Sequence, residues 1–312
     1  MNISPRATQL AYNGKPMSDS KPDSGSDCSR RYLFDNADVR GETVHLDQAL
    51  RDILDIHQYA PGVQQLLGQF LAASVLLSTT LKFEGKLILQ VRSQGQIPLL
   101  MVECNDRLQI RAIARGAQEA TSDNFDVLLE NGQLAITIDP VEGQRYQGIV
   151  PLVNSSLAHS LDAYFLQSEQ LHTRFWLASD GDRAAGMLLQ QLPPQLTPEA
   201  EAREAQWQHL CALAETIESG ELLNLPADEL LYRLFHEEPV RLLDEQDVAF
   251  ACSCSRERTL NALATLDQAE IESILEEQGA ITMDCEFCNQ QYRYARTDLG
   301  DILGESPDNT LH

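Results

Sequence analysis

The sequence has few aromatic and few basic side chains. Aromatic residues make up 6% of the 312 residues, and 23 lysines and arginines stand against 47 aspartates and glutamates. The formal net charge of −24 repels phosphate polymers and anionic lipid, because proteins bind both through clustered lysine and arginine. We therefore expect a protein that binds no nucleic acid.

Membrane and secretory segments are also lacking. No stretch reaches the roughly 18 consecutive apolar residues that a membrane-spanning helix needs. Residues 1–29 are rich in Ser, Asp, Pro, Gly and Lys and hold no apolar segment, which excludes a secretory signal peptide. We expect residues 1–30 to form a disordered tail, and the protein to be cytoplasmic with no membrane partner.

Three common catalytic signatures are missing from the chain. It has no Walker A run, no Gly-x-Ser-x-Gly elbow and no His-Glu-x-x-His motif. The seven histidines are scattered, and each, such as His159, is expected to be a packed or solvated side chain. The sequence therefore favours a protein that is not an enzyme.

The charge that is present is unevenly placed along the chain. Residues 195–312 carry 25 acidic and 7 basic side chains, whereas residues 1–194 carry 22 and 16. This asymmetry predicts a boundary near Pro193 and Pro194.

Residues 31–197 are predicted to form an α+β domain with an antiparallel sheet. Helical spacing of apolar residues indicates helices at 45–57 and 63–81, the second apolar over most of its circumference and therefore central. A third helix is expected from a cap at Ser155 or Ser156 to Glu169. Alternating patterns predict strands at 86–92, 99–104, 108–115, 134–138, 146–150, 171–178 and 185–192. The last two are expected to form a second antiparallel layer or hairpin.

Residues 198–251 are predicted to form a helical linker. Two segments, 199–218 and 227–236, have the spacing of amphipathic helices with thin apolar stripes. Such stripes cannot form a core alone, so these helices are expected to pack on a neighbouring surface.

Four of the seven cysteines form two close pairs in residues 252–312. The pairs are Cys252-Ser-Cys254 and Cys285-Glu-Phe-Cys288, and residues 255–284 separate them. Two thiol pairs brought together by a short fold make a tetrahedral site for one Zn²⁺ ion. Between them we expect a helix capped by Ser255, a second helix from Asp267 to Gln278, and a strand over 281–283.

Other interpretations of these cysteines remain open. A zinc module could be a permanent structural element of a binding protein, and Cys285-Glu-Phe-Cys288 could exchange disulfides as an oxidoreductase does. Structural disulfides are disfavoured by the absent signal peptide and the odd cysteine total. A DNA-binding zinc ribbon is disfavoured by Asp284 and Glu286, which flank Cys285. Cys104 and Cys211 fall in apolar patterns and are expected to be inert, and Cys28 has no assigned role.

A zinc site of this kind can also act as a redox switch. Zinc keeps all four sulfurs deprotonated, and thiolates are the form that oxidants attack. A module of this length cannot fold on apolar burial alone, so the metal supplies folding free energy on the order of 10–16 kcal/mol. Oxidation of the sulfurs to disulfides would remove the ligands and unfold the module.

The cysteine motif, together with four others, resembles the bacterial redox-regulated 33 kDa heat-shock chaperonin family. The resemblance covers most of the chain from Arg31 onward. It is carried by Cys252-Ser-Cys-Ser-Arg-Glu-Arg258 with Cys285-Glu-Phe-Cys288, by Arg31-Tyr-Leu-Phe34, by Arg40-Gly-Glu42, by Glu142-Gly-Gln-Arg-Tyr-Gln-Gly148 and by Tyr164-Phe-Leu-Gln-Ser-Glu-Gln170.

The resemblance implies an ATP-independent holdase for unfolded client proteins. Such a chaperone is inactive when reduced and zinc-bound, and becomes active when an oxidant such as peroxide or hypochlorite, with heat, unfolds the tail. It also implies disulfides Cys252–Cys254 and Cys285–Cys288 with zinc release, and a homodimer on oxidative activation. Once the linker is released, we expect clients to bind apolar residues there: Trp207, Ile217, Leu230, Leu231, Leu234 and Phe235.

Overall fold

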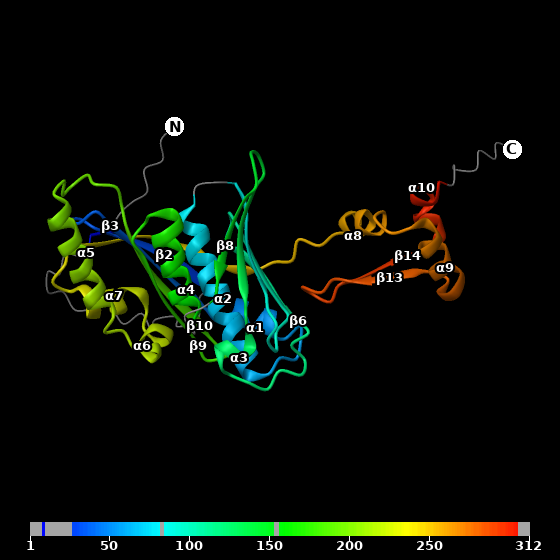
Figure 1. Ribbon diagram of the computed structural model, residues 1–312, viewed down its shortest axis with the longest axis horizontal. Coiled ribbons are helices and arrows are strands. Elements are labelled where there is room, and N and C mark those ends of the chain that lie inside the picture. Colours follow the sequence, from blue (N-terminus) through cyan, green and yellow to red (C-terminus); the bar gives the residue numbers. More distant parts are fainter. Residues whose placement is uncertain (1–7, 10–26, 82–83, 153–155, 305–312) are drawn as a thin grey trace. The chain divides into compact units, whose positions relative to one another are not determined.

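The computed structural model describes residues 8–9, 27–81, 84–152 and 156–304, and it divides into two compact units. The first unit ends at Ala251 and the second begins at Cys252 (Figure 1). The disordered tail expected over residues 1–30 lies largely outside the described residues. Two parts differ from the expectation: Thr8–Gln9 form a short strand, β1, and the first long strand, β2, already begins at Cys28.

One of the two six-stranded sheets of the first unit is antiparallel throughout, and we call it sheet A. Strands β9 and β10 form the hairpin that the sequence predicted, at one edge of this sheet. In spatial order the strands are β1 (Thr8–Gln9), β11 (Val240–Asp247), β2 (Cys28–Phe34), β3 (Val39–Leu46), β10 (Ala184–Gln191) and β9 (Thr173–Ser179).

The second sheet, sheet B, contains the five strands predicted between residues 86 and 150. They pair antiparallel, and a short strand from the end of the linker adds in parallel at one edge. In spatial order the strands are β12 (Ala249–Phe250), β6 (Gln109–Arg115), β5 (Leu99–Asn105), β4 (Gly85–Arg92), β7 (Gln133–Pro140) and β8 (Tyr146–Pro151).

The long helix α2 (Pro61–Thr80) lies between the two sheets, as the prediction of a central helix requires (Figure 1). Apolar residues surround it, and Phe70 and Leu71 in its middle are completely buried. The inner faces of both sheets pack against it, so this helix is the centre of the main hydrophobic core. Three shorter helices contribute buried residues to the same core: α1 (Gln48–Leu54), α3 (Phe125–Leu128) and α4 (Leu157–Tyr164).

Three of the predicted helices differ from the structure at their ends. The helix expected over 199–218 ends at Ala214, and a separate helix follows at Ser219–Asn224. The helix expected from residue 45 starts at Gln48, because His45 and Leu46 still pair with β10 as part of β3. Ser156 caps α4 by accepting a hydrogen bond from the His159 amide. Beyond Tyr164 the expected α-helix continues as one π-helical turn, η1 (Phe165–Glu169).

The linker helices cover the face of sheet A that is turned away from α2. They are α5 (Ala200–Ala214), α6 (Ser219–Asn224) and α7 (Ala227–Phe235), and they share a second hydrophobic core with β2, β3, β10 and β11. The expectation that they pack on a neighbouring surface is confirmed. The linker is not helical throughout, because Val240 and Leu242 bury their side chains in the same core as part of β11.

The second unit is small and has a small core. It consists of α8 (Arg256–Leu263), α9 (Gln268–Gln278), the hairpin β13 (Ile281–Asp284) and β14 (Gln291–Tyr294), the turn η2 (Arg296–Asp298) and α10 (Gly300–Leu303). Ser255 and Asp267 cap α8 and α9 as predicted, and Gly279 ends α9 in the left-handed conformation. The buried apolar residues that form this core are Leu263, Ile271, Leu275, Ile281, Tyr294 and Leu299.

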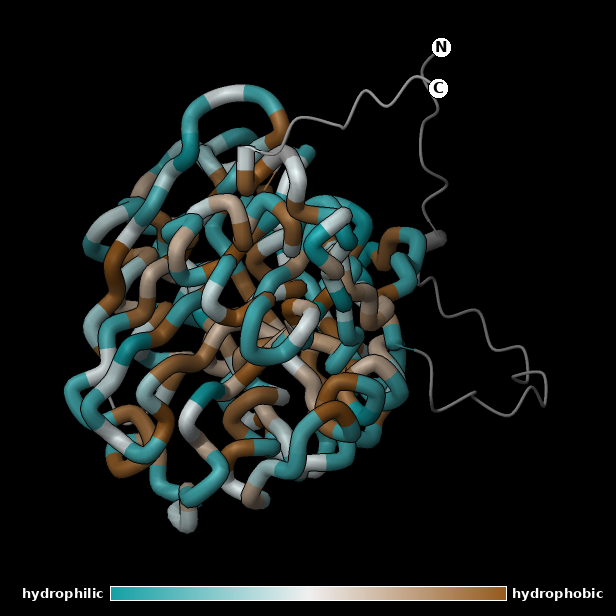
Figure 2. Tube along the Cα trace, turned by 90° about the vertical axis from the view of Figure 1, so that its right-hand side faces the viewer, coloured by the Kyte–Doolittle hydropathy of each residue, from teal (hydrophilic) through white to brown (hydrophobic). Residues whose placement is uncertain are grey.

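Hydrophobic and hydrophilic residues alternate over short distances along the chain (Figure 2). This pattern is typical of half-buried strands and amphipathic helices. Within the described part of the chain, no helix combines the length and the apolar character that crossing a membrane requires.

Candidate metal centre

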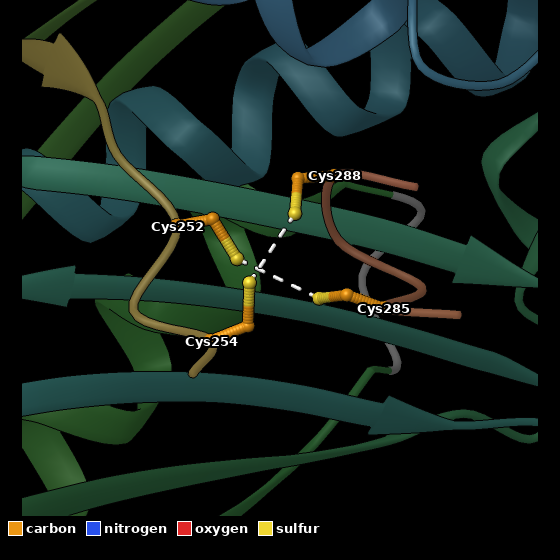
Figure 3. Close-up of side chains that lie close together, drawn as sticks. All are labelled: Cys252, Cys254, Cys285 and Cys288. Atoms are coloured by element: carbon orange, nitrogen blue, oxygen red, sulfur yellow. Dashed lines mark hydrogen bonds between the residues drawn. The ribbon is translucent and has the colours of Figure 1, made fainter. Parts of the chain in front are cut away.

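The two cysteine pairs meet in the second unit. The sulfur atoms of Cys252, Cys254, Cys285 and Cys288 all lie within 4.8 Å of one another and point toward a common centre (Figure 3). The Cys252 and Cys285 sulfurs are 3.6 Å apart, and the Cys254 and Cys288 sulfurs are 3.5 Å apart. The predicted thiol cluster is therefore present.

The turn from Cys285 to Cys288 is shaped by its own backbone. The amides of Cys288 and Asn289 both donate to the Cys285 carbonyl, at 3.2 and 2.7 Å. Asn289 adopts a positive φ of 56°, which lets the chain reverse directly after the second thiol. The Cys285 amide closes the turn by donating to the Gln290 carbonyl at 2.9 Å. This geometry directs both thiols to the same side of the turn.

The turn from Cys252 to Cys254 is held by the start of α8. Ser255 caps this helix by accepting from the Arg258 amide at 3.2 Å. The Arg258 guanidinium reaches back and donates to the carbonyl and hydroxyl oxygens of Ser253, both at 2.7 Å. The residue between the two thiols is therefore fixed by the same helix that follows them.

Burial raises the pKa of the Cys285 and Cys288 thiols. The backbone amide of Phe287 opposes this shift at Cys285, and that of Gln290 opposes it at Cys288, because each donates to the sulfur. Four neighbouring thiolates would repel one another, so a cation among them would favour the deprotonated form. The cluster is thus one in which a metal ion and protons compete for the same sulfurs.

The four sulfurs fit the geometry of a tetrahedral metal site. Zn–S bonds of about 2.3 Å place tetrahedrally arranged sulfurs about 3.8 Å apart. Two of the sulfur distances here, 3.5 and 3.6 Å, lie near that value. Thiolates are soft ligands, which suit zinc, cuprous ion or iron–sulfur chemistry. These four cysteines could therefore hold one metal ion.

The remaining cysteines do not join this cluster. Cys104 is buried in β5, and burial raises its pKa to about 12. Cys211 is half-buried on α5, and burial likewise raises its pKa to about 12. Both thiols stay protonated at neutral pH and are poor nucleophiles. Cys28 lies in β2, opposite His45 of β3.

The residues predicted to bind clients lie together in the first unit. They form part of the core between the linker helices and sheet A, and Leu230, on α7, is completely buried. Trp207, Leu231, Leu234 and Phe235 are also buried, and Ile217 packs at the margin of the same core. In this structure, these side chains are therefore covered.

Two residues beside the metal centre were not predicted. The Tyr292 hydroxyl donates to the Cys254 sulfur at 3.2 Å, and Arg256 forms several contacts that join α8 to β14. Cysteine spacing carries no information about either contact, because both depend on how β14 pairs after the second turn.

Comparison with known proteins identifies the family. The sequence model described as Hsp33 protein matches residues 27–295. The chain belongs to the Hsp33 family. The 33 kDa chaperonin of Pseudomonas paraeruginosa is 51% identical, and the alignment covers 93% of this chain and all of that protein. The 33 kDa chaperonin of Ectopseudomonas mendocina is 49% identical over 92% of this chain and all of that protein.

A solved structure supports the same fold. The crystal structure of the 33 kDa chaperonin of Thermotoga maritima matches with a TM-score of 0.76 at 22% identity, covering 89% of this chain and 98% of the other. The Hsp33 relatives are named chaperonins, and the members of this family are not enzymes. Membership supports a chaperone function and implies that the protein binds unfolded client proteins.

Proposed function

We propose that this protein is a redox-regulated, ATP-independent holdase that is inactive when reduced and zinc-bound. The observation that carries the proposal is the meeting of four thiols in a unit whose own hydrophobic core is small. Such a unit depends on its metal to stay folded, so chemistry at the sulfurs controls its structure. Family membership supplies the chaperone function that this control would regulate.

The metal is assigned as one Zn²⁺ ion held by Cys252, Cys254, Cys285 and Cys288. Four thiolates in a closed tetrahedral arrangement are typical of structural zinc sites. When bound, zinc neutralises the thiolates and contributes folding free energy on the order of 10–16 kcal/mol. The turns described above direct the four sulfurs toward one another for this role.

Activation is an oxidation of the four sulfurs by a peroxide. Two thiolates lose two electrons and join as a disulfide, while one hydrogen peroxide takes these electrons with two protons and becomes two waters. Two such steps remove all four ligands. We propose the pairs Cys252–Cys254 and Cys285–Cys288. Sulfurs of different pairs also lie close together, at 3.5 and 3.6 Å, so the pairing has to be determined by peptide mapping.

The client-binding surface is the core between the linker helices and sheet A. Loss of the folded second unit would leave the chain after Phe250 unstructured and would favour lifting of α5, α6 and α7. The apolar side chains of Trp207, Ile217, Leu230, Leu231, Leu234 and Phe235 would then become available to unfolded proteins. The net charge of −24 would help to keep the loaded complex in solution.

The active form is further proposed to be a homodimer that works in the cytoplasm. An apolar face uncovered by lifting of the linker would be available to a second copy as well as to clients. Sedimentation of the reduced and the oxidised protein tests this part directly.

The proposal is tested by comparing reduced and peroxide-treated protein in a client-aggregation assay. Light scattering of heat-denatured citrate synthase should be suppressed by the oxidised protein and not by the reduced protein. Cys254→Ser should lower the zinc content, whereas Cys28→Ser, a cysteine outside the cluster, should leave both zinc content and regulation unchanged. Equal suppression by reduced and oxidised protein would refute redox regulation, and steady turnover of insulin disulfides would favour an oxidoreductase instead.

A further inference from the structure

In the second unit, strand β14 contacts the first cysteine pair although it follows the second. The Tyr292 hydroxyl on this strand donates a hydrogen bond to the Cys254 sulfur at 3.2 Å. Hydrogen bonds from outer groups orient metal-binding side chains and tune how strongly they bind. Tyr292 thereby joins the β13–β14 hairpin to a sulfur on the opposite side of the cluster.

Arg256 makes a second connection to the same strand. It lies two residues after Cys254, at the first position of α8. Its Nη1 donates to the Arg293 carbonyl at 2.9 Å, and its Nη2 pairs with Asp298 at 3.0 Å. Its guanidinium carbon lies 4.4 Å from the centroid of the Tyr294 ring, which is a cation–π distance. One side chain therefore contacts three residues of the segment that follows the second cysteine turn.

Tyr294 completes the connection from the side of the core. It is completely buried among the apolar residues of the second unit. Its hydroxyl donates to the Arg256 carbonyl at 2.8 Å and also contacts the Thr259 hydroxyl. Both the backbone carbonyl and the side chain of Arg256, at the start of α8, therefore contact the segment that follows the second cysteine turn.

We infer that Tyr292 and Arg256 are positioning residues for the metal centre. They hold the Cys252–Cys254 turn against β14, so that its sulfurs face those of Cys285 and Cys288. This inference rests on the proposed function, because it concerns how tightly the proposed Zn²⁺ is held and how fast oxidation releases it.

The physical reason lies in the long connection between the two turns. Residues 255–284 separate the pairs, so bringing the sulfurs together costs loop-closure entropy each time the site forms. Contacts between β14 and α8 form together with the metal-bound fold, and their free energy offsets part of this cost. Removing an outer contact of this kind lowers metal affinity by about 10–100-fold in other sites.

The test uses the full chain with three substitutions and one control. Tyr292→Phe removes only the hydroxyl, Arg256→Met removes the charge and its contacts, and Arg256→Lys keeps the charge. Arg296→Met is the matched control, since Arg296 pairs with Glu272 at 3.7 Å on the surface of the same unit. Zinc affinity is measured by competition with a chelator, and the release rate by chelator absorbance at a fixed peroxide concentration.

Tyr292→Phe is expected to weaken zinc binding about tenfold and to speed peroxide-driven release, and Arg256→Met to do so at least as strongly. Arg256→Lys should recover part of the loss, and Arg296→Met should behave as the unsubstituted chain. Cobalt substituted for zinc reports the ligand set, so an unchanged tetrahedral thiolate spectrum shows that all four sulfurs still bind.

Wild-type affinity in both Tyr292→Phe and Arg256→Met would overturn the inference, as would an equal loss in Arg296→Met. A failure of the proposed function is distinguishable from these results. In that case the unsubstituted protein would keep its metal in peroxide, while the affinity comparison would still decide the role of the two residues.

Discussion

The linker helices should open without any oxidant if their packing on sheet A is weakened at Phe235. This side chain is 1% exposed and lies near the centre of the core under α7. Its ring meets Phe34 edge-on at a centroid distance of 5.1 Å and lies 6.3 Å from Tyr32. Both partners belong to β2, so Phe235 directly joins the helical layer to the sheet.

Phe235→Ala removes these contacts and leaves a cavity. Truncation of a buried phenylalanine costs about 3–5 kcal/mol. The helical layer can open while both sheets and α2 stay folded, since it packs on the outer face of sheet A. If the cost falls on the closed layer alone, the ratio of open to closed molecules rises by about two to nearly four orders of magnitude.

The assay is suppression of citrate synthase aggregation by the reduced, zinc-loaded variant, together with hydrogen exchange of residues 200–235. We expect protection of the client and fast exchange in α5 and α7, with zinc still bound. Phe175→Ala is the matched control. Phe175 is 3% exposed on the other face of sheet A, in the core around α2, so its loss destabilises the unit without uncovering the linker surface.

Two results would refute this reasoning. The first is a reduced Phe235→Ala protein that exchanges quickly in the linker but does not protect the client. The second is equal activation by Phe175→Ala, because general destabilisation would then explain both variants.

Three further predictions concern the two units separately. Cys254→Ser, or removal of zinc by a chelator, should abolish helical structure in residues 256–278, measured by NMR, while the core of the first unit around α2 stays folded. Burial raises the pKa of Asp162 from 3.8 to about 7, so the stability that its bound proton contributes is lost as the pH rises between these two values. Thermal melts should therefore show Asp162→Asn gaining stability relative to the original chain from about pH 4 to about pH 7, with no further gain above that. The buried Asp38 carboxylate accepts the backbone amides of residues 195–197 at 3.0–3.1 Å, so Asp38→Ala should lose about 2–3 kcal/mol in urea unfolding. An unchanged NMR spectrum would contradict the first prediction. A stability difference between Asp162→Asn and the original chain that does not vary with pH would contradict the second, and an unchanged urea midpoint in Asp38→Ala would contradict the third.

The sequence predicted local structure well where one apolar pattern dominated. The central helix α2, strands β4 to β8 and helices α8 and α9 were expected close to their observed ends. Their periodicities are strong, and Ser156, Ser255, Asp267 and Gly279 mark helix ends through local hydrogen bonds or a positive φ. Such signals are contained within a few residues and so can be found without a structure.

Strands whose patterns are short or mixed with charge were missed. In β11 only the first part is apolar, and its second part, from Glu245 to Asp247, is acidic and exposed. It forms a strand because β2 offers a partner edge, a reason that lies more than two hundred residues away in sequence. Likewise β3 takes the start of the expected helix at residue 45, because pairing with β10 outweighs local helical spacing.

At the candidate site, too, the sequence predicted the features that depend on local spacing and missed those that depend on distant pairing. Spacing alone predicted that Cys252, Cys254, Cys285 and Cys288 form a cluster, and the sulfurs do lie together. The hydrogen bond of Tyr292 to a sulfur could not be predicted, because it depends on the register of β13 with β14. The sequence also predicted that the helices with the client-binding candidates pack on a neighbouring surface. It did not predict that this surface is sheet A.

In the proposed function, bound metal keeps the chaperone inactive. Oxidation of the four cysteine sulfurs releases the metal and activates the chaperone. The most direct measurement follows metal release, far-ultraviolet circular dichroism and client light scattering in one peroxide-treated sample over time. Metal release and loss of helical signal should proceed together, and client protection should not precede them. Full client protection while the metal is still bound, or complete metal release without any protection, would contradict it.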